Sequence, residues 1–144
     1  MTVAIIGAGH VGQALARGLV DKGWRVRFGV PEPAKYADLP SRYEGRAVVG
    51  DVASAIAPCA LVILAVPFGA ALQVSRSVPD WSERILVDAT NPIAPGLAGL
   101  SVGTTDSGAE TSARLATNAR VVKAFNTTGF EDLADPHYPS GDLF

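Results

Sequence analysis

The sequence is poor in the side chains on which most catalytic and metal centres depend. Its 144 residues include one cysteine and only two histidines, His10 and His137. It contains no Ser-His-Asp grouping, no CxxC pair and no His/Asp cluster with metal-ligand spacing. A disulfide within the chain is excluded. We interpret Cys59, which precedes an apolar run, as a small buried residue rather than a reactive thiol.

Long apolar runs and a strong charge of either sign are also missing. The net charge is −2, which gives no electrostatic footprint for nucleic acid or an anionic membrane. The longest apolar run, near residues 60–66, has the length of a strand and not of a membrane span. The N-terminus has no basic region followed by an apolar stretch and cleavage site, so we expect a cytoplasmic protein.

What is present is a regular alternation of apolar runs with segments of helical spacing. Strands are predicted at 2–6, 25–29, 47–49, 60–66, 85–89 and 121–125, and helices at 11–22, 36–39, 52–57, 70–77 and 110–117. This alternation predicts an α/β fold, a Rossmann-type doubly wound parallel sheet of about six strands in three layers. It would comprise residues 1–126 as one dinucleotide-binding domain. Residues 127–144 show little periodicity and are expected to form a C-terminal tail.

A glycine-spaced loop joins the first predicted strand to the first predicted helix. Gly7, Gly9 and Gly12 follow the pattern G-x-G-x-x-G. The first glycine permits a tight turn, the second lets the backbone approach a pyrophosphate, and the third lets the helix pack closely on the strand. Free N–H groups and the positive helix end would then face the phosphates. The predicted cofactor-binding residues of this loop are Gly7, Ala8, Gly9, His10, Val11 and Gly12.

The end of the second strand bears on the choice between NAD and NADP. An NAD site usually has Asp or Glu there, for the ribose 2′-hydroxyl, but this chain has Val30 and Pro31. The missing acid favours NADP, because no charge repels a 2′-phosphate, and Lys35 is the nearest downstream cation. Glu32 could still serve NAD, so NAD stays the alternative. Val30 and Lys35 are the candidate contacts at this end of the cofactor.

Short polar and aromatic segments follow the fourth, fifth and sixth predicted strands. Ligands of open parallel sheets bind outside the carboxyl ends of the strands, so these segments should converge near a nicotinamide ring. The cofactor-binding candidates among them are Ala65, Val66, Pro67, Asn91 and Pro92, and the substrate-binding candidates are Phe68, Asn126 and Thr127. We interpret Asp88 as a loop cap and Lys123 as a lysine that snorkels at a sheet edge.

No obvious general acid or base accompanies this rim, and we assign no catalytic side chain. A dehydrogenase acting on an alcohol needs one near the carbon that changes, whereas hydride exchange between two cofactor rings depends chiefly on their stacking and separation. Three hypotheses remain open. The chain is an oxidoreductase that exchanges hydride between two cofactor rings, or a non-catalytic dinucleotide-binding or redox-sensing module. The third hypothesis is a fragment similar to the N-terminal domain of β-hydroxyacid dehydrogenases or ketopantoate reductases.

Four segments in this order resemble the NADP oxidoreductase, coenzyme F420-dependent family. They are residues 3–12, 65–68, 88–92 and 121–127. The resemblance implies an NADPH site on the glycine loop and the end of the second strand. It further implies a second ligand, coenzyme F420 or a flavin, that stacks on the nicotinamide near Val66, Pro67, Asn91 and Asn126.

The chain departs from this family in two places. Family members commonly have an arginine just after the second strand, where this chain has Pro31. They also continue past the Asn126 motif with a strand and helix that help to form the second-ligand pocket and a dimer. The tail at 127–144 is therefore expected to be truncated relative to the family. The second-ligand site is then either incomplete or completed by a partner subunit in a homodimer.

Overall fold

Six parallel strands form the central sheet of the computed structural model, which describes residues 1–94, 96, 99–102, 105–134, 137–138 and 141–142. The strands are β1 (Thr2–Ile6), β2 (Arg25–Gly29), β3 (Ala47–Gly50), β4 (Leu61–Leu64), β5 (Ile85–Asp88) and β6 (Arg120–Lys123). Their order is β3-β2-β1-β4-β5-β6, and every neighbouring pair is parallel. This is the order of a doubly wound sheet whose direction of winding reverses between β1 and β4. The predicted fold class is confirmed.

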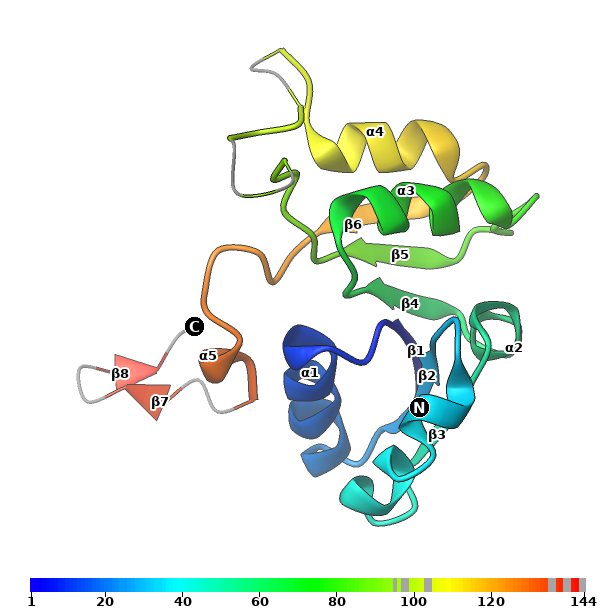
Figure 1. Ribbon diagram of the computed structural model, residues 1–144, viewed down its shortest axis with the longest axis vertical. Coiled ribbons are helices and arrows are strands. Elements are labelled where there is room, and N and C mark those ends of the chain that lie inside the picture. Colours follow the sequence, from blue (N-terminus) through cyan, green and yellow to red (C-terminus); the bar gives the residue numbers. More distant parts are fainter. Residues whose placement is uncertain (95, 97–98, 103–104, 135–136, 139–140, 143–144) are drawn as a thin grey trace.

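Helices cover both faces of the sheet (Figure 1). The helix α1 (His10–Asp21) covers one face, and the short α5 (Glu131–Ala134) packs beside it. The other face carries α2 (Val52–Ile56), α3 (Phe68–Ser77) and α4 (Gly108–Leu115). In the described part of the chain no helix is long and apolar enough to cross a membrane.

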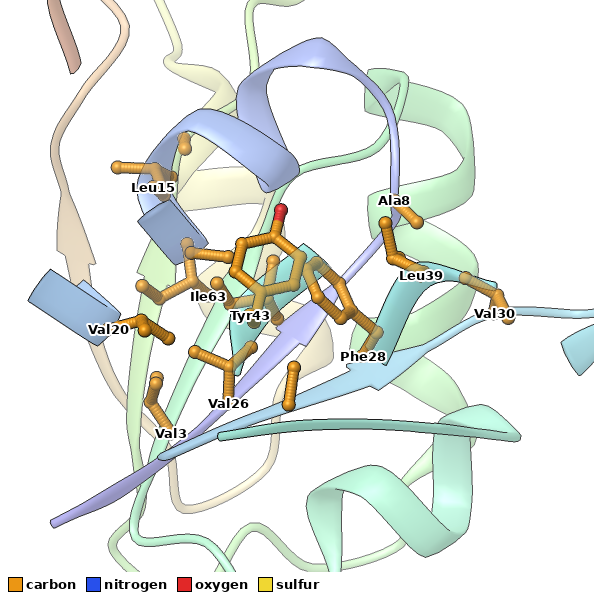
Figure 2. Close-up of a cluster of buried hydrophobic side chains, with 14 of the residues drawn as sticks. Val3, Ala8, Leu15, Val20, Val26, Phe28, Val30, Leu39, Tyr43 and Ile63 are labelled. Carbon is orange, nitrogen blue, oxygen red and sulfur yellow. The ribbon is translucent and has the colours of Figure 1, made fainter. Parts of the chain in front are cut away.

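Alternate residues of β1 enter two separate hydrophobic cores. Val3 and Ile5 are fully buried in the cluster under α1, which Figure 2 shows. Ala4 and Ile6 point to the opposite face and pack in the cluster that contains Trp81. Because side chains of a strand alternate between its faces, burial of all four places β1 in the middle of the sheet. The glycine loop therefore starts from the most buried strand of the fold.

The segment between β2 and β3 differs from the prediction. The short helix expected at 36–39 is replaced by two 3₁₀ turns, η1 (Pro33–Tyr36) and η2 (Leu39–Tyr43). η1 has a proline at its first position and η2 has one at its second. Pro40 therefore lies at the start of a turn, whereas the sequence predicted a helix that ends just before it. Leu39 and Tyr43 are buried in the core under α1, and this tertiary contact fixes the second turn.

The C-terminal segment contains more structure than its weak periodicity predicted. Leu133 of α5 is partly buried against the core under α1. A Cβ placed on Gly18 of α1 would lie 3.3 Å from the carbonyl oxygen of Leu133, so the two helices approach closely at a glycine. Two short antiparallel strands follow, β7 (His137–Tyr138) and β8 (Gly141–Asp142). A four-residue helix has no periodicity to read, and packing on α1 is what forms it.

The interpretation of Cys59 is confirmed. The side chain is 3% exposed and lies in the core that contains Trp81. Burial raises the pKa of the Cys59 thiol, because the thiolate would lose its hydration. A reactive thiolate at neutral pH is therefore disfavoured.

We predict that Trp81→Ala lowers the free energy of unfolding by about 3–5 kcal/mol, measured by urea denaturation followed by circular dichroism. The ring is fully buried, and its Nε1 donates a hydrogen bond of 3.0 Å to the carbonyl oxygen of Ser75. Trp24→Ala is the matched control, because Trp24 is only partly buried and should cost less. Equal losses in the two variants would contradict this assignment of the core.

Candidate functional site

Gly7 and Gly12, at the two ends of the turn between β1 and α1, are packed too closely against backbone atoms to carry a Cβ. Gly7 has a φ of +103°, and its N–H donates to the carbonyl oxygen of Gly29 at 2.9 Å. A Cβ on Gly7 would lie 2.4 Å from the carbonyl oxygen of Ala65. A Cβ on Gly12 would lie 2.3 Å from the carbonyl oxygen of Gly7. Both glycines are thus required by backbone packing and by the tight turn.

Gly9 differs from these two glycines. A Cβ at Gly9 would have no heavy atom within 4 Å, and its backbone lies in the extended region that any residue adopts. The protein alone therefore does not require glycine at this position. Because Gly9 has no side chain, the space in front of the first turn of α1 stays open.

That first turn has unpaired backbone donors. The N–H groups that begin a helix have no partner within it, and no side chain caps α1 at Gly9. The helix α3 also begins uncapped, at Pro67. By contrast, Asp51 caps α2, and a capping box of Ser107 and Glu110 caps α4. Of these four helices, the two without a side-chain cap are the two that begin at the same hollow.

This hollow, of about 360 Å³, lies at the carboxyl edge of the sheet, where the winding direction reverses between β1 and β4. Its lining brings together Gly9, His10, Val11, Ala65, Val66, Pro67 and Asn91 from the predicted site residues, with Ala89, Thr90 and Phe130. Open α/β sheets bind their ligands at such reversal points. Segments far apart in the sequence therefore form one cavity at the expected edge.

Several candidate residues lie away from this hollow. Ala8 and Val30 are 5% and 1% exposed, and the N–H of Val30 donates to the carbonyl oxygen of Gly50 at 3.0 Å. Phe68 is nearly buried and packs against Gly108 of α4, so it does not form an apolar wall of the hollow. Pro92 lines a separate hollow beside the start of α4.

The two asparagines at the carboxyl edge contact each other. The Nδ2 of Asn126 donates to the Oδ1 of Asn91 at 3.3 Å, and the Nδ2 of Asn91 donates to the carbonyl oxygen of Asn126 at 3.4 Å. Phe125, just before Asn126, has a φ of +65°, which turns the chain out of β6. Thr127 is exposed next to the pair. The structure thus joins the loops after β5 and β6 through two amides at the hollow.

An aromatic stack that the sequence did not predict closes one side of the hollow. The rings of His10 and Phe130 are stacked with centroids 4.8 Å apart and an angle of 20° between planes. Both residues also line a neighbouring hollow of about 390 Å³ over α1, so the stack separates the two. Phe130 precedes α5, and no spacing rule pairs it with His10. Its aromatic character in a polar tail was the only available indication.

Asp88 and Lys123 interact at the ends of β5 and β6. The Oδ1 of Asp88 accepts hydrogen bonds from the N–H and the hydroxyl of Thr90, at 2.8 and 2.7 Å, which confirms that Asp88 caps its loop. Lys123 does not snorkel outward. Its Nζ lies 3.2 Å from the Oδ1 of Asp88 and donates to the carbonyl oxygen of Thr90. The attraction between the ammonium and the buried Asp88 carboxylate outweighs the hydration that the ammonium would gain at the sheet edge.

Lys35 forms an ion pair with Glu32. Its Nζ lies 2.7 Å from the Oε1 of Glu32, and the two side chains are 66% and 64% exposed. An exposed pair of this kind is worth about 0–1 kcal/mol, so a phosphate could compete for the lysine. Lys35 lies in η1, the turn that follows β2.

A more enclosed hollow, of about 220 Å³, lies elsewhere and is lined by Arg25, Arg27 and Arg46 among others. Arg25 begins β2, Arg27 lies at the middle of β2, and Arg46 directly precedes β3. The glycine loop and the asparagine pair are at the opposite edge, so this hollow does not belong to the site described above.

Comparison with known proteins gives a family match and several structural relatives. The family model described as NADP oxidoreductase, coenzyme F420-dependent matches residues 2–92. A hypothetical protein from Sinorhizobium meliloti is 31% identical with a TM-score of 0.87, over 99% of this chain and 70% of that one. A provisionally named F420-dependent NADP reductase from Arthrobacter sp. FB24 is 26% identical with a TM-score of 0.84, over 94% and 67%.

More distant structures share the fold alone. An imine reductase from Aspergillus terreus, in complex with NADPH4, is 23% identical with a TM-score of 0.73. The alignment covers 94% of this chain but 44% of that protein. No curated protein matches the sequence.

We predict that Gly9→Val leaves the fold intact and abolishes NADPH binding, whereas Gly12→Ala destabilises the fold. A Cβ at position 9 has no protein heavy atom within 4 Å, so valine should be accommodated there and would occupy the space in front of the α1 donors, while alanine at position 12 collides with the Gly7 carbonyl oxygen. Thermal denaturation and nicotinamide fluorescence titration measure the two effects. Wild-type NADPH affinity in Gly9→Val would show that the diphosphate binds elsewhere.

Proposed function

Because the chain belongs to the NADP oxidoreductase, coenzyme F420-dependent family, we propose that it transfers hydride between NADPH and a deazaflavin or flavin-like acceptor. The family match spans the sheet from β1 to the start of the loop after β5. NADPH, when bound, supplies the hydride. The role of this chain is to bind the cofactor, orient its ring and keep one face of it accessible.

The uncapped N-terminus of α1 is the observation that carries this proposal. Its first-turn N–H groups and the positive end of the helix dipole favour an anion in front of Gly9. The absence of a side chain at Gly9 lets a diphosphate approach the backbone. Asp51 and Ser107 fill the equivalent position on α2 and α4, whereas at α1 the position is a glycine and stays open.

The chemistry of the hollow favours transfer between two rings over oxidation of an alcohol. Its described lining consists of small apolar residues with Thr90, Asn91 and the His10–Phe130 stack. His10 is the one titratable side chain among these lining residues. An alcohol dehydrogenase needs a proton acceptor at the reacting carbon, whereas ring-to-ring transfer needs mainly alignment. Ala65, Val66 and Pro67 would flank the nicotinamide, and the Asn91–Asn126 pair would offer it amide groups.

For the second ligand, the exposed side of the asparagine pair is the proposed position. Asn91 is exposed and Asn126 and Thr127 follow β6 at the same edge. Phe130 is 38% exposed and provides an apolar ring next to the hollow. A planar acceptor ring could rest on these groups while the nicotinamide lies on the other side.

We predict that Lys35→Ala lowers affinity for NADPH by about fivefold and leaves NADH affinity unchanged. The reason is that Lys35 is held by a weak exposed pair and can turn to a 2′-phosphate. Fluorescence titrations with both nucleotides measure this, with Lys22→Ala as a matched surface control. An unchanged ratio of the two affinities would remove Lys35 from the cofactor site.

We predict that the protein oxidises NADPH when a deazaflavin or FMN is present, and that Gly9→Val does not. The decay of reduced-nicotinamide absorbance measures turnover, with a ferric chelate as a third acceptor. If wild-type protein binds NADPH but turns over with none of them, the oxidoreductase proposal fails. The chain would then be the non-catalytic dinucleotide-binding or redox-sensing module that the sequence left open.

A further inference from the structure

A fully buried carboxylate organises the loop that follows β5. Asp88 is 0% exposed, and its Oδ1 accepts from both the N–H and the hydroxyl of Thr90. Its Oδ2 accepts from the hydroxyl of Ser112 on α4, at 3.2 Å. A buried carboxylate needs such donors, and a positive partner, to offset its lost hydration.

Lys123 is that positive partner. It pairs with Asp88 in the parallel register of β5 and β6, and its Nζ lies 3.2 Å from the Asp88 Oδ1. The same ammonium donates to the carbonyl oxygen of Thr90. Only 28% of the Lys123 side chain is exposed, although β6 is an edge strand. The ammonium therefore binds the Asp88 carboxylate and the Thr90 carbonyl oxygen instead of extending into water.

The segment held in this way forms a wall of the candidate site. Thr90 and the next residue, Asn91, line the hollow, and Asn91 is paired with Asn126. Asn126 itself follows Lys123 on the same stretch of chain. Lys123 is thus linked to both asparagines. It contacts Thr90, the residue before Asn91, and it precedes Asn126 by three residues along the chain.

We propose that Lys123 is a positioning residue, which sets the Asn91–Asn126 pair by binding Asp88 and the Thr90 carbonyl oxygen. This inference rests on the proposed function, in which the pair faces the nicotinamide. In this proposal Lys123 does not contact the nicotinamide or the acceptor ring, and it influences them only by holding the loop after β5. Without its ammonium, the Thr90 carbonyl loses a donor, and the buried carboxylate loses its counter-charge. The loop then no longer holds Asn91 in one orientation.

The experiment compares four variants of the whole chain: Lys123→Met, Lys123→Arg, Asp88→Asn with Lys123→Met, and the surface control Lys22→Met. Two quantities are measured, namely the dissociation constant for NADPH and the side-chain amide resonances of Asn91 and Asn126 in ¹⁵N–¹H NMR spectra. Replacing each asparagine by glutamine in turn assigns these resonances. The chemical shifts of these two side-chain amides report directly on the conformation of the loop. A general loss of stability would not change these two resonances in particular.

In Lys123→Met we expect both amide resonances to shift and the dissociation constant for NADPH to rise by about fivefold or more. Lys123→Arg should restore most of the affinity, because a guanidinium can also bind a carboxylate and a carbonyl. Lys22→Met should behave as wild type. If Lys123→Met keeps both resonances in place and binds NADPH normally, the proposal is wrong.

Should Lys123→Met not fold, the double variant keeps the test decisive. Removing both charges together avoids leaving an unpaired buried carboxylate. The double variant should fold and still show shifted amides, whereas unshifted amides would overturn the proposal. Failure of the proposed function is a separate outcome. Wild-type protein would then either not bind NADPH or bind it without turnover, while the amide resonances would still report on Lys123.

Discussion

The close approach of α1 to the ends of β1 and β4 is the constraint from which the site follows. Backbone atoms of Gly7, Gly12 and Ala65 meet with no room for a Cβ. This contact fixes where α1 begins and directs its free N–H groups toward the hollow at the carboxyl edge. Because donors and dipole are held before any ligand arrives, an anion bound there would require little rearrangement of the backbone.

A second constraint acts on the other side of the hollow. The contacts of Asp88 with Thr90, Ser112 and Lys123 tie together β5, β6 and α4. Buried charges are costly unless each is paired, so this network tolerates little displacement of its members. The hollow consequently lies between closely packed backbone on one side and, on the other, the Thr90–Asn91 segment that these charges hold. Hydride transfer between stacked rings depends on such fixed separation.

The C-terminal segment contributes Phe130 to the candidate site from outside the region that the family model matches. Phe130 stacks on His10 at the start of α1, and α5 then packs on the same helix near Gly18. The segment is therefore attached to the helix whose N-terminus is proposed to bind the cofactor. Through Phe130 it also lines both neighbouring hollows. Sequence periodicity gave no indication of either contact.

The order of strands and helices along the chain, the glycine loop and the edge expected to carry the site were determined by the sequence itself, because apolar periodicity and glycine spacing are local properties. Observed bounds of the main strands and helices differ from the predicted ones by no more than two residues at either end. Tertiary structure alone decided the inward turn of Lys123, the burial of Phe68 and the stack of Phe130 on His10. These depend on which distant segment packs beside each side chain, and a single sequence does not encode that locally.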